Sequence, residues 1–357
     1  YFLDRSGFRG FFSDVDALTT SIGNVSLYYH GRVMENIRMG NVTDCYTING
    51  WASNQYTNHC DIADLYRNPV GDTGILEQYC KPLYVAVKLR DKVVPAGSSV
   101  IADFYIINEA GLKGQHNLTV ILEDEIGVKL FEKTFQTEIE GGEEYGQLLA
   151  DNVGIQLSKS PGYYTVRAVL TGSKGTTKAA GQDKIFTVDL YDAEIPVNGA
   201  VIDTSGVINR MLSKTWDIVL PQYSEKTHDP DYVIIGPNSL RNANSLTPIL
   251  ECVVNGSTAI VIARTDWFAE SISSSNSSYY AVDYRGKYTM SRGNFVAGRH
   301  EILDGLPQAQ AFNWEYQDFN FHQRQDLYAL RLNVAHTVVA AVSDHKKEIG
   351  TAVAVIP

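Results

Sequence analysis

The residues whose types and spacing could carry chemistry lie between positions 49 and 59. Asn49-Gly50-Trp51 ends a short apolar run, and Asn58 and His59 follow in a polar stretch. An indole face can stack on the C–H face of a pyranose ring, while amide and imidazole groups can bond its hydroxyls. The spacing therefore predicts a sugar site at Trp51, with Asn49 and His59 beside it. The competing interpretation is a tryptophan that caps a core next to a polar turn.

The elements that must position this segment are predicted from periodicity and from start and stop signals. Apolar residues recur at helical spacing around 28–39, Ser13 to Asp16 has the composition of a helix start, and Gly40-Asn41 that of a helix stop. Asp44 to Trp51 is typical of a strand that opens into a polar loop ending near Gly74. Active sites of (β/α)8 barrels lie at such strand ends.

From Leu83 to Leu190 the pattern is that of β-structure throughout. Short apolar runs alternate with turns rich in Gly and Pro, which is typical of an antiparallel sandwich. The predicted strands are 83–87, 100–107, 118–122, 128–135, 163–170 and 184–188.

After Pro196 strands and helices alternate, which predicts a parallel sheet covered by helices. Strands are predicted at 200–203, 231–236 and 258–263, helices at 207–212 and 246–254, and further strands at 328–334, 337–342 and 351–356.

One set of motifs covers about residues 1 to 190. Its members are Asp44 to Trp51, Asn58-His59, Asp61 to Asp64, Tyr66-Arg67-Asn68-Pro69, Pro82 to Lys88, Gly141-Gly142, Tyr145-Gly146, Gly162 to Tyr164 and Gly181 to Asp183. Together they resemble the C-terminal part of family 2 glycoside hydrolases, the β-galactosidase and β-glucuronidase-like enzymes. The resemblance implies a mixed fold, with a (β/α)8 barrel remnant at 1–80 and an immunoglobulin-like β-sandwich at 81–192.

The resemblance also implies which residues touch the sugar. In the family a Trp at this strand end forms part of the sugar site, so substrate binding is expected at Trp51, with Asn49 and His59. Position 70 is Val, where uronide-cleaving relatives carry a Lys nearby, and this argues against uronic acid specificity.

The mechanism that the resemblance implies is retaining hydrolysis of β-linked sugars by two carboxyl groups about 5 Å apart. In the family these groups follow the fourth and seventh barrel strands, so both are expected before or near Tyr1. Glu35 and Glu77, the only glutamates of the first 80 residues, follow no predicted strand and are predicted at the surface. Asn108-Glu109 resembles the family's acid/base pair but falls in the sandwich, where a turn carboxylate is expected. No catalytic residue is therefore assigned in this chain.

Residues 193–357 resemble a flavodoxin-like or glutamine-amidotransferase-like α/β domain. An amidotransferase nucleophile lies on a strained strand-to-helix turn. Cys252 instead lies on a predicted helix before a strand, so the domain is predicted to be a non-catalytic accessory.

Composition excludes several other classes of protein. The formal net charge of −11 argues against nucleic acid and anionic membranes as partners. No apolar run approaches the ~20 residues that span a bilayer. The spacing of the four cysteines, Cys45, Cys60, Cys80 and Cys252, is not that of a metal site, and we expect free or buried thiols. The alternative is one disulfide among the first three. Neither a cofactor nor a metal is predicted, since no phosphate-cradling motif occurs.

The resemblance implies a carbohydrate as a partner. Both chain ends resemble the interior of a longer protein, so the remaining N-terminal domains of that protein are expected as a further partner. A periplasmic or secreted location is expected, since polymers do not cross membranes. Two alternatives remain. A stand-alone carbohydrate-binding module would expose aromatic residues such as Tyr163 or Trp267. A structural module would form a homo-oligomer without sugar affinity.

Overall fold

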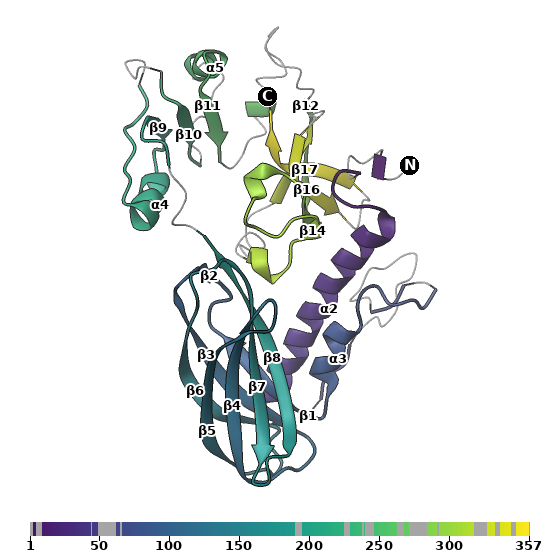
Figure 1. Ribbon diagram of the computed structural model, residues 1–357. Helices are drawn as coiled ribbons and strands as arrows, with labels where there is room; N and C mark the ends of the chain where they lie inside the picture. Colours follow the sequence, from purple (N-terminus) through teal and green to yellow (C-terminus); the bar gives the residue numbers. More distant parts are fainter. Residues whose placement is uncertain are drawn as a thin grey trace. The chain divides into compact units, whose positions relative to one another are not determined.

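The computed structural model describes residues 3–4, 9–43, 45–48, 62–64, 66–189, 195–224, 229–237, 239, 246–262, 268–270, 284–290, 293–317, 327–332, 336–343 and 348–356. The chain divides into two compact units (Figure 1). Unit 1 is Tyr1–Asp192 with Asn294–Arg324, and unit 2 is Ala193–Gly293 with Gln325–Pro357. The chain therefore passes between the units three times. The expected boundaries near residues 80 and 192 stay predictions.

Helix α2, Val15–Gly40, is the longest element of unit 1. Asp14 caps its start by accepting a hydrogen bond from the backbone N–H of Ala17 at 2.8 Å, and Asn41 ends it in the left-handed conformation with φ 51°. Both predicted end signals are confirmed. The apolar period predicted only the second half of the helix, because α2 packs against several neighbours and buries residues on more than one face.

Two glycines let other segments come very close to α2. A Cβ at Gly23 would lie 1.9 Å from the carbonyl oxygen of Val70, and one at Gly31 would lie 2.0 Å from the ring of Tyr79. Tyr79 belongs to helix α3, Gly74–Cys80, which packs beside α2. Any larger side chain at these positions would push the neighbouring segments away from the helix.

The centre of unit 1 is an antiparallel β-sandwich of two sheets (Figure 1). One sheet has the order β1-β3-β6, and the other has the order β2-β8-β7-β4-β5 with β2 parallel to β8. The strands are β1 Leu83–Leu89, β2 Val93–Pro95, β3 Ser99–Asn108, β4 Gly114–Asp124, β5 Lys129–Ile139, β6 Gly146–Gln156, β7 Gly162–Gly172 and β8 Thr177–Val188.

The sandwich core follows from alternation along the strands. Every second residue of β3 from Val100 to Ile106 is buried, and these side chains meet those of β4, β7 and β8 in one apolar cluster. All six predicted strands are confirmed. Strands β2 and β6 were not predicted, because β2 has three residues and the apolar pattern of β6 is interrupted at Asp151-Asn152, where its pairing with β3 is irregular.

Residues 45–48, the described part of the predicted barrel strand, form no β-strand. That local prediction is wrong for these four residues. A parallel barrel strand needs hydrogen-bonded neighbours, and the described part of the first 80 residues offers only an isolated bridge between Ala63 and Pro69.

A segment from the C-terminal half also belongs to unit 1, and we call residues 294–317 the strap. It contains β13, Gly293–Ala297, which pairs with β14, Gln310–Ala311, and two short 3-10 helices, η2 at Glu301–Leu303 and η3 at Trp314–Tyr316. The backbone N–H of Ala311 donates to the Ser21 hydroxyl of α2 at 2.8 Å.

Unit 2 begins with the predicted parallel strands. β9 Gly199–Ile202, β10 Tyr232–Ile235 and β11 Thr258–Val261 form a sheet of order β11-β10-β9, and helices α4 Val207–Trp216 and α5 Thr247–Val254 lie between them in sequence. These five elements confirm the strand–helix prediction. Antiparallel strands follow in the order β12-β15-β17-β16, at Tyr284–Met290, Leu327–Leu332, Glu348–Val355 and His336–Ser343. No described helix is both long and apolar enough to cross a membrane.

We predict that Gly23→Ala destabilises unit 1, whereas Gly40→Ala in the same helix does not. The new methyl group at position 23 would meet the backbone of Val70, and such overpacking costs about 1–3 kcal/mol. A Cβ at Gly40 meets only a side-chain methyl at 3.7 Å, and alanine favours helix over glycine by about 1 kcal/mol. Urea unfolding followed by circular dichroism measures both, and equal stability of the two variants would contradict the close approach.

Candidate functional site

The predicted sugar-binding residues Asn49, Trp51 and His59 lie outside the described residues. The structure does describe both ends of the segment that carries them. Ile48 before it and Ile62 after it pack into the same apolar cluster, whose buried members include Leu27, Met34 and Leu76 of α2 and α3. The segment 49–61 therefore starts and finishes on one fixed platform.

The chain that follows Ile62 is a tight turn held by Asp64. Its carboxylate accepts hydrogen bonds from the backbone N–H groups of Tyr66 and Asn68, both at 2.8 Å, and the backbone N–H of Val70 donates to Ile62 O at 3.1 Å. Burial acts to raise the pKa of Asp64, but the hydrogen bonds that it accepts from the side-chain amide of Asn68 and from the backbone N–H groups of the turn outweigh burial and lower the pKa. The turn leaves Tyr66 83% exposed, beside the platform.

Asn24 of α2 accepts a hydrogen bond from the backbone N–H of Asp72 at 2.7 Å. Together with the contact at Gly23, this bond fixes the C-terminal side of the turn on the helix. Val70 packs partly into the platform, so position 70 supplies an apolar side chain and no charge.

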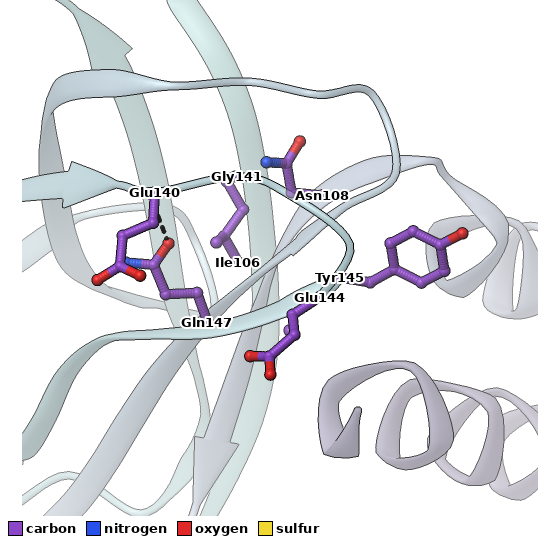
Figure 2. Close-up of a pocket in the computed structure, with 8 residues that line it drawn as sticks. Ile106, Asn108, Glu140, Gly141, Glu144, Tyr145 and Gln147 are labelled. Atoms are coloured by element: carbon purple, nitrogen blue, oxygen red, sulfur yellow. Dashed lines mark hydrogen bonds between the residues drawn. The ribbon is translucent and has the colours of Figure 1, made fainter. Parts of the chain in front are cut away.

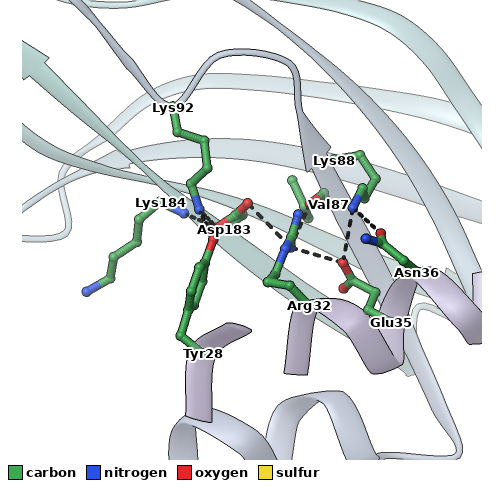
Figure 3. Close-up of polar contacts among 9 residues, drawn as sticks. All are labelled: Tyr28, Arg32, Glu35, Asn36, Val87, Lys88, Lys92, Asp183 and Lys184. Carbon is green, nitrogen blue, oxygen red and sulfur yellow. Dashed lines mark hydrogen bonds and ion pairs between the residues drawn. The ribbon is translucent and has the colours of Figure 1, made fainter. Parts of the chain in front are cut away.

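Glu35, predicted at the surface, is buried, and that prediction is wrong. It is only 2% exposed and belongs to an ionic network between α2 and the sandwich (Figure 3). Arg32 lies 3.0 Å from Glu35 and 3.5 Å from Asp183 of β8. Lys88 of β1 lies 3.7 Å from Glu35, and the ammonium of Lys92 donates to Asp183. The helical pattern gave no signal for this burial, since the partners come from strands 53 to 148 residues away in sequence.

The same network extends through Lys92 to aromatic rings. The ammonium of Lys92 donates to the hydroxyl of Tyr28 at 2.8 Å and lies 4.3 Å from the ring centre of Trp314 in the strap. A cation over an aromatic face gains electrostatic attraction that grows as water is excluded. Lys92 thus joins α2, the sandwich and the strap.

Burial acts to lower the pKa of Arg32, but Asp183 and Glu35 outweigh it and raise the pKa. Burial sets the direction of the pKa shift for three other groups of this network. It raises the pKa of Glu35, against the opposing effects of Arg32 and Lys88. It lowers the pKa of Lys88 and of Lys92. These shifts mark groups enclosed by protein, and a carboxyl that no substrate can reach does not act as an acid or base. The network is a structural clamp.

The other two glutamates are where the sequence predicted them. Glu77 is exposed on α3. Glu109 lies in the turn after β3 and accepts a hydrogen bond from Arg38 at 2.7 Å. Arg38 also donates to the carbonyl oxygens of Tyr79 and Lys81. Asn108 closes the turn through two hydrogen bonds with the backbone of Leu112. The predicted turn role of Asn108-Glu109 is confirmed.

A small hollow lies near this turn, between the ends of β3 and β6 (Figure 2). Gln147 accepts a hydrogen bond from the backbone N–H of Glu140 across it at 3.1 Å. Its volume is about 40 Å³, whereas ligand pockets span roughly 300–1,000 Å³. The hollow can hold water molecules but no sugar ring.

No group of three or more metal-ligating side chains occurs among the residues that the structure describes. Cys45, Cys80 and Cys252 are free thiols, and Cys60 lies outside the described residues. Cys252 lies on α5 before β11, as predicted, with its sulfur 3.3 Å from the hydroxyl of Tyr223.

No family model matches this sequence, and no curated protein matches it. Among solved structures, the exo-chitosanase CsxA of Amycolatopsis orientalis is 16% identical over 48% of this chain and 20% of its own, with a TM-score of 0.34. The β-glucuronidase of Bacteroides uniformis is 12% identical over 53% of this chain and 24% of its own, with a TM-score of 0.24.

A CARDB domain from Pyrococcus furiosus is also similar, at 15% identity over 30% of this chain and 93% of its own, with a TM-score of 0.23. Glycoside hydrolases are thus among the similar structures. This chain spans a quarter or less of the length of the two enzymes named above.

We predict that Asp183→Asn lowers the free energy of unfolding by about 3–5 kcal/mol, because it leaves Arg32 and Lys92 as buried charges without their shared partner. The matched control is Glu123→Gln, which breaks the more exposed pair with Arg167 and should cost under about 1 kcal/mol. Urea unfolding at pH 7 compares them, and a small loss for Asp183→Asn would show that the clamp is dispensable.

We further predict that Glu35→Gln changes the pH dependence of stability. The folded state raises the pKa of Glu35, so folding favours the protonated carboxyl. The stability that Glu35 contributes is present below its pKa in the unfolded state, about 4.3, and is lost as pH rises through its pKa in the folded state. The stability of the unchanged chain minus that of Glu35→Gln should therefore fall as pH rises from about 4 to 7. A difference that rises over this range would mean that Arg32 and Lys88 outweigh burial.

Proposed function

We propose that this chain is the C-terminal part of a family 2 retaining glycoside hydrolase acting on β-linked sugars. In this proposal it supplies sugar-binding residues and no catalytic glutamate. The observation that carries it is the platform at the two ends of the segment 49–61, where the flanking residues Ile48 and Ile62 pack into one cluster with α2 and α3. A binding segment anchored at both ends loses less conformational entropy when it takes up a ligand.

The proposed site recognises neutral sugar groups. Trp51 stacks on the sugar ring, while Asn49 and His59 bond its hydroxyls. The nearest described carboxylate on each side of the segment in sequence is occupied elsewhere, Glu35 by the clamp and Asp64 by its own turn. The apolar packing of Val70 favours a neutral sugar over a uronic acid. The acid/base and the nucleophile of retaining hydrolysis would come from preceding residues of the parent protein, which would be periplasmic or secreted.

The alternative of a carbohydrate-binding sandwich finds less support in the described residues. It requires exposed aromatic rings, but Tyr163 packs against Phe186 and Trp314 and donates its hydroxyl to Glu315. Its ring is therefore not free to stack on a sugar. Trp267, the other aromatic residue of that alternative, lies outside the described residues.

We predict that the chain binds β-linked oligosaccharides through Trp51 and does not hydrolyse them. Saturation-transfer NMR detects weak binding, and Trp51→Ala should reduce affinity about tenfold or more, a loss of about 1.4 kcal/mol. The matched control is Tyr145→Ala, which removes an aromatic side chain that is 46% exposed elsewhere on unit 1.

Three outcomes would count against the proposal. Equal binding by Trp51→Ala and the unchanged chain would remove the site from Trp51. Absence of any sugar signal, together with a stable dimer in light scattering, would favour an assembly module. Release of reducing sugar by this chain would place catalytic carboxyls inside it.

A further inference from the structure

One of the polar contacts between the strap and the rest of unit 1 is made by a buried acid, Glu315. The hydroxyl of Tyr163 on β7 donates to Oε1 of Glu315 at 3.0 Å. Oε2 of Glu315 is buried and receives no hydrogen bond within the part of the chain that the structure describes. Ionised carboxylates buried in proteins are normally stabilised by several donors, so this site suits the neutral acid better.

Positive charges near Glu315 oppose this preference only in part. The ammonium of Lys92 faces it from the turn before β2, but is already engaged by Asp183 and by the hydroxyl of Tyr28. Lys184 of β8 faces it with its ammonium 6.0 Å from the ring of Tyr163. The remaining titratable neighbours, Tyr29 of α2 and Tyr316 of the strap, are phenols that carry no positive charge. Burial is the largest effect, and the pKa of Glu315 is raised.

The remainder of the strap would stay intact if this contact opened. Phe312 stacks on Tyr316 with ring centres 4.0 Å apart, and Phe295 lies 5.8 Å from Phe312. These contacts lie within the strap. Within unit 1, the strap contacts α2 and the sandwich through the Ala311–Ser21 hydrogen bond and through the cluster of Trp314 and Glu315 with Lys92 and Tyr163.

We propose that Glu315 makes the docking of the strap a proton-controlled latch, closed while the carboxyl is protonated and loosened when it ionises. The proposal is independent of the proposed sugar site. Because the pKa of Glu315 is higher when the strap is docked than when it is open, docking of the strap is coupled to the uptake of a proton. Docking is strongest below the ordinary glutamate pKa of about 4.3 and weakens as pH rises toward the pKa of Glu315 in the docked state. For one proton, the equilibrium constant for docking falls by up to tenfold per pH unit.

Hydrogen exchange followed by mass spectrometry on the 357-residue chain tests the latch between pH 5 and pH 8. Glu315→Gln mimics the neutral acid and should keep the strap protected at every pH. The ratio of strap exchange in the unchanged chain to that in Glu315→Gln cancels the intrinsic pH dependence of exchange, and should rise by up to tenfold per pH unit. Glu301→Gln, an exposed glutamate of the same strap, is the control and should behave as the unchanged chain does.

A ratio that stays constant from pH 5 to pH 8 would overturn the proposal, because it would mean that Lys92 and Lys184 stabilise the ionised acid fully. Peptides from β4 and β7 report whether each variant keeps its sandwich core. If Glu315→Gln loses core protection, Tyr163→Phe replaces it. That variant removes the hydrogen bond from the Tyr163 hydroxyl, which is stronger to the ionised acid than to the neutral one, so strap exchange should increase more at pH 8 than at pH 5. An equal effect of Tyr163→Phe at both pH values would also overturn the latch.

Discussion

The ion pairs of Asp183 with Arg32 and Lys92 are the contact on which the arrangement of unit 1 depends. They join a helix, a sheet and the residue before a short strand, and they are buried, so each charge must keep its partner. Replacing such pairs by apolar residues is often no less stable, which means that their value lies in orientation as much as in energy. With charges at fixed places on α2 and β8, these pairs favour the observed placement of the helix along the sandwich.

Helix α2 in turn positions the rest of unit 1. One part of it meets the sandwich through Arg32 and Glu35, and another receives Val70 and Tyr79 in the space left by Gly23 and Gly31. The strap is held by Ser21, and by Tyr28 through Lys92. The apolar platform that holds Ile48 and Ile62, the residues flanking the segment 49–61, is built partly from the same helix. A change in the position of α2 would therefore reach the proposed sugar site and the strap together.

The described carboxylates near these contacts serve the fold. Asp183, Glu35 and Glu109 neutralise buried or half-buried cations. In unit 2 the carboxylate of Asp203 accepts hydrogen bonds from Ser205 and from the backbone N–H of Ile208 at the start of α4. These bonds lower its pKa although burial acts to raise it. The proposed recognition of a neutral sugar by an indole, an amide and an imidazole would therefore fall to the segment 49–61.

The sequence by itself determined most of the secondary structure. The signals that predict it are local, because each depends on only a few neighbouring residues. They are the alternation along β3 and β7, the caps at Asp14 and Asn41, and the apolar runs of β9, β10 and β11. The turn role of Asn108-Glu109 was predictable for the same reason. Motif resemblance supplied the candidate residues Asn49, Trp51 and His59.

Only the tertiary structure decided which charges are buried and which segments share a unit. Glu35 sits in an ordinary helical pattern, and nothing local shows that Lys88 and Asp183 lie near it and its neighbour Arg32. The return of the strap to unit 1 likewise depends on partners more than 100 residues away in sequence, such as Tyr163 for Glu315. Burial and charge pairing depend on residues that are neighbours in space, and the hydrophobic periodicity of a single helix or strand does not predict which residues those are.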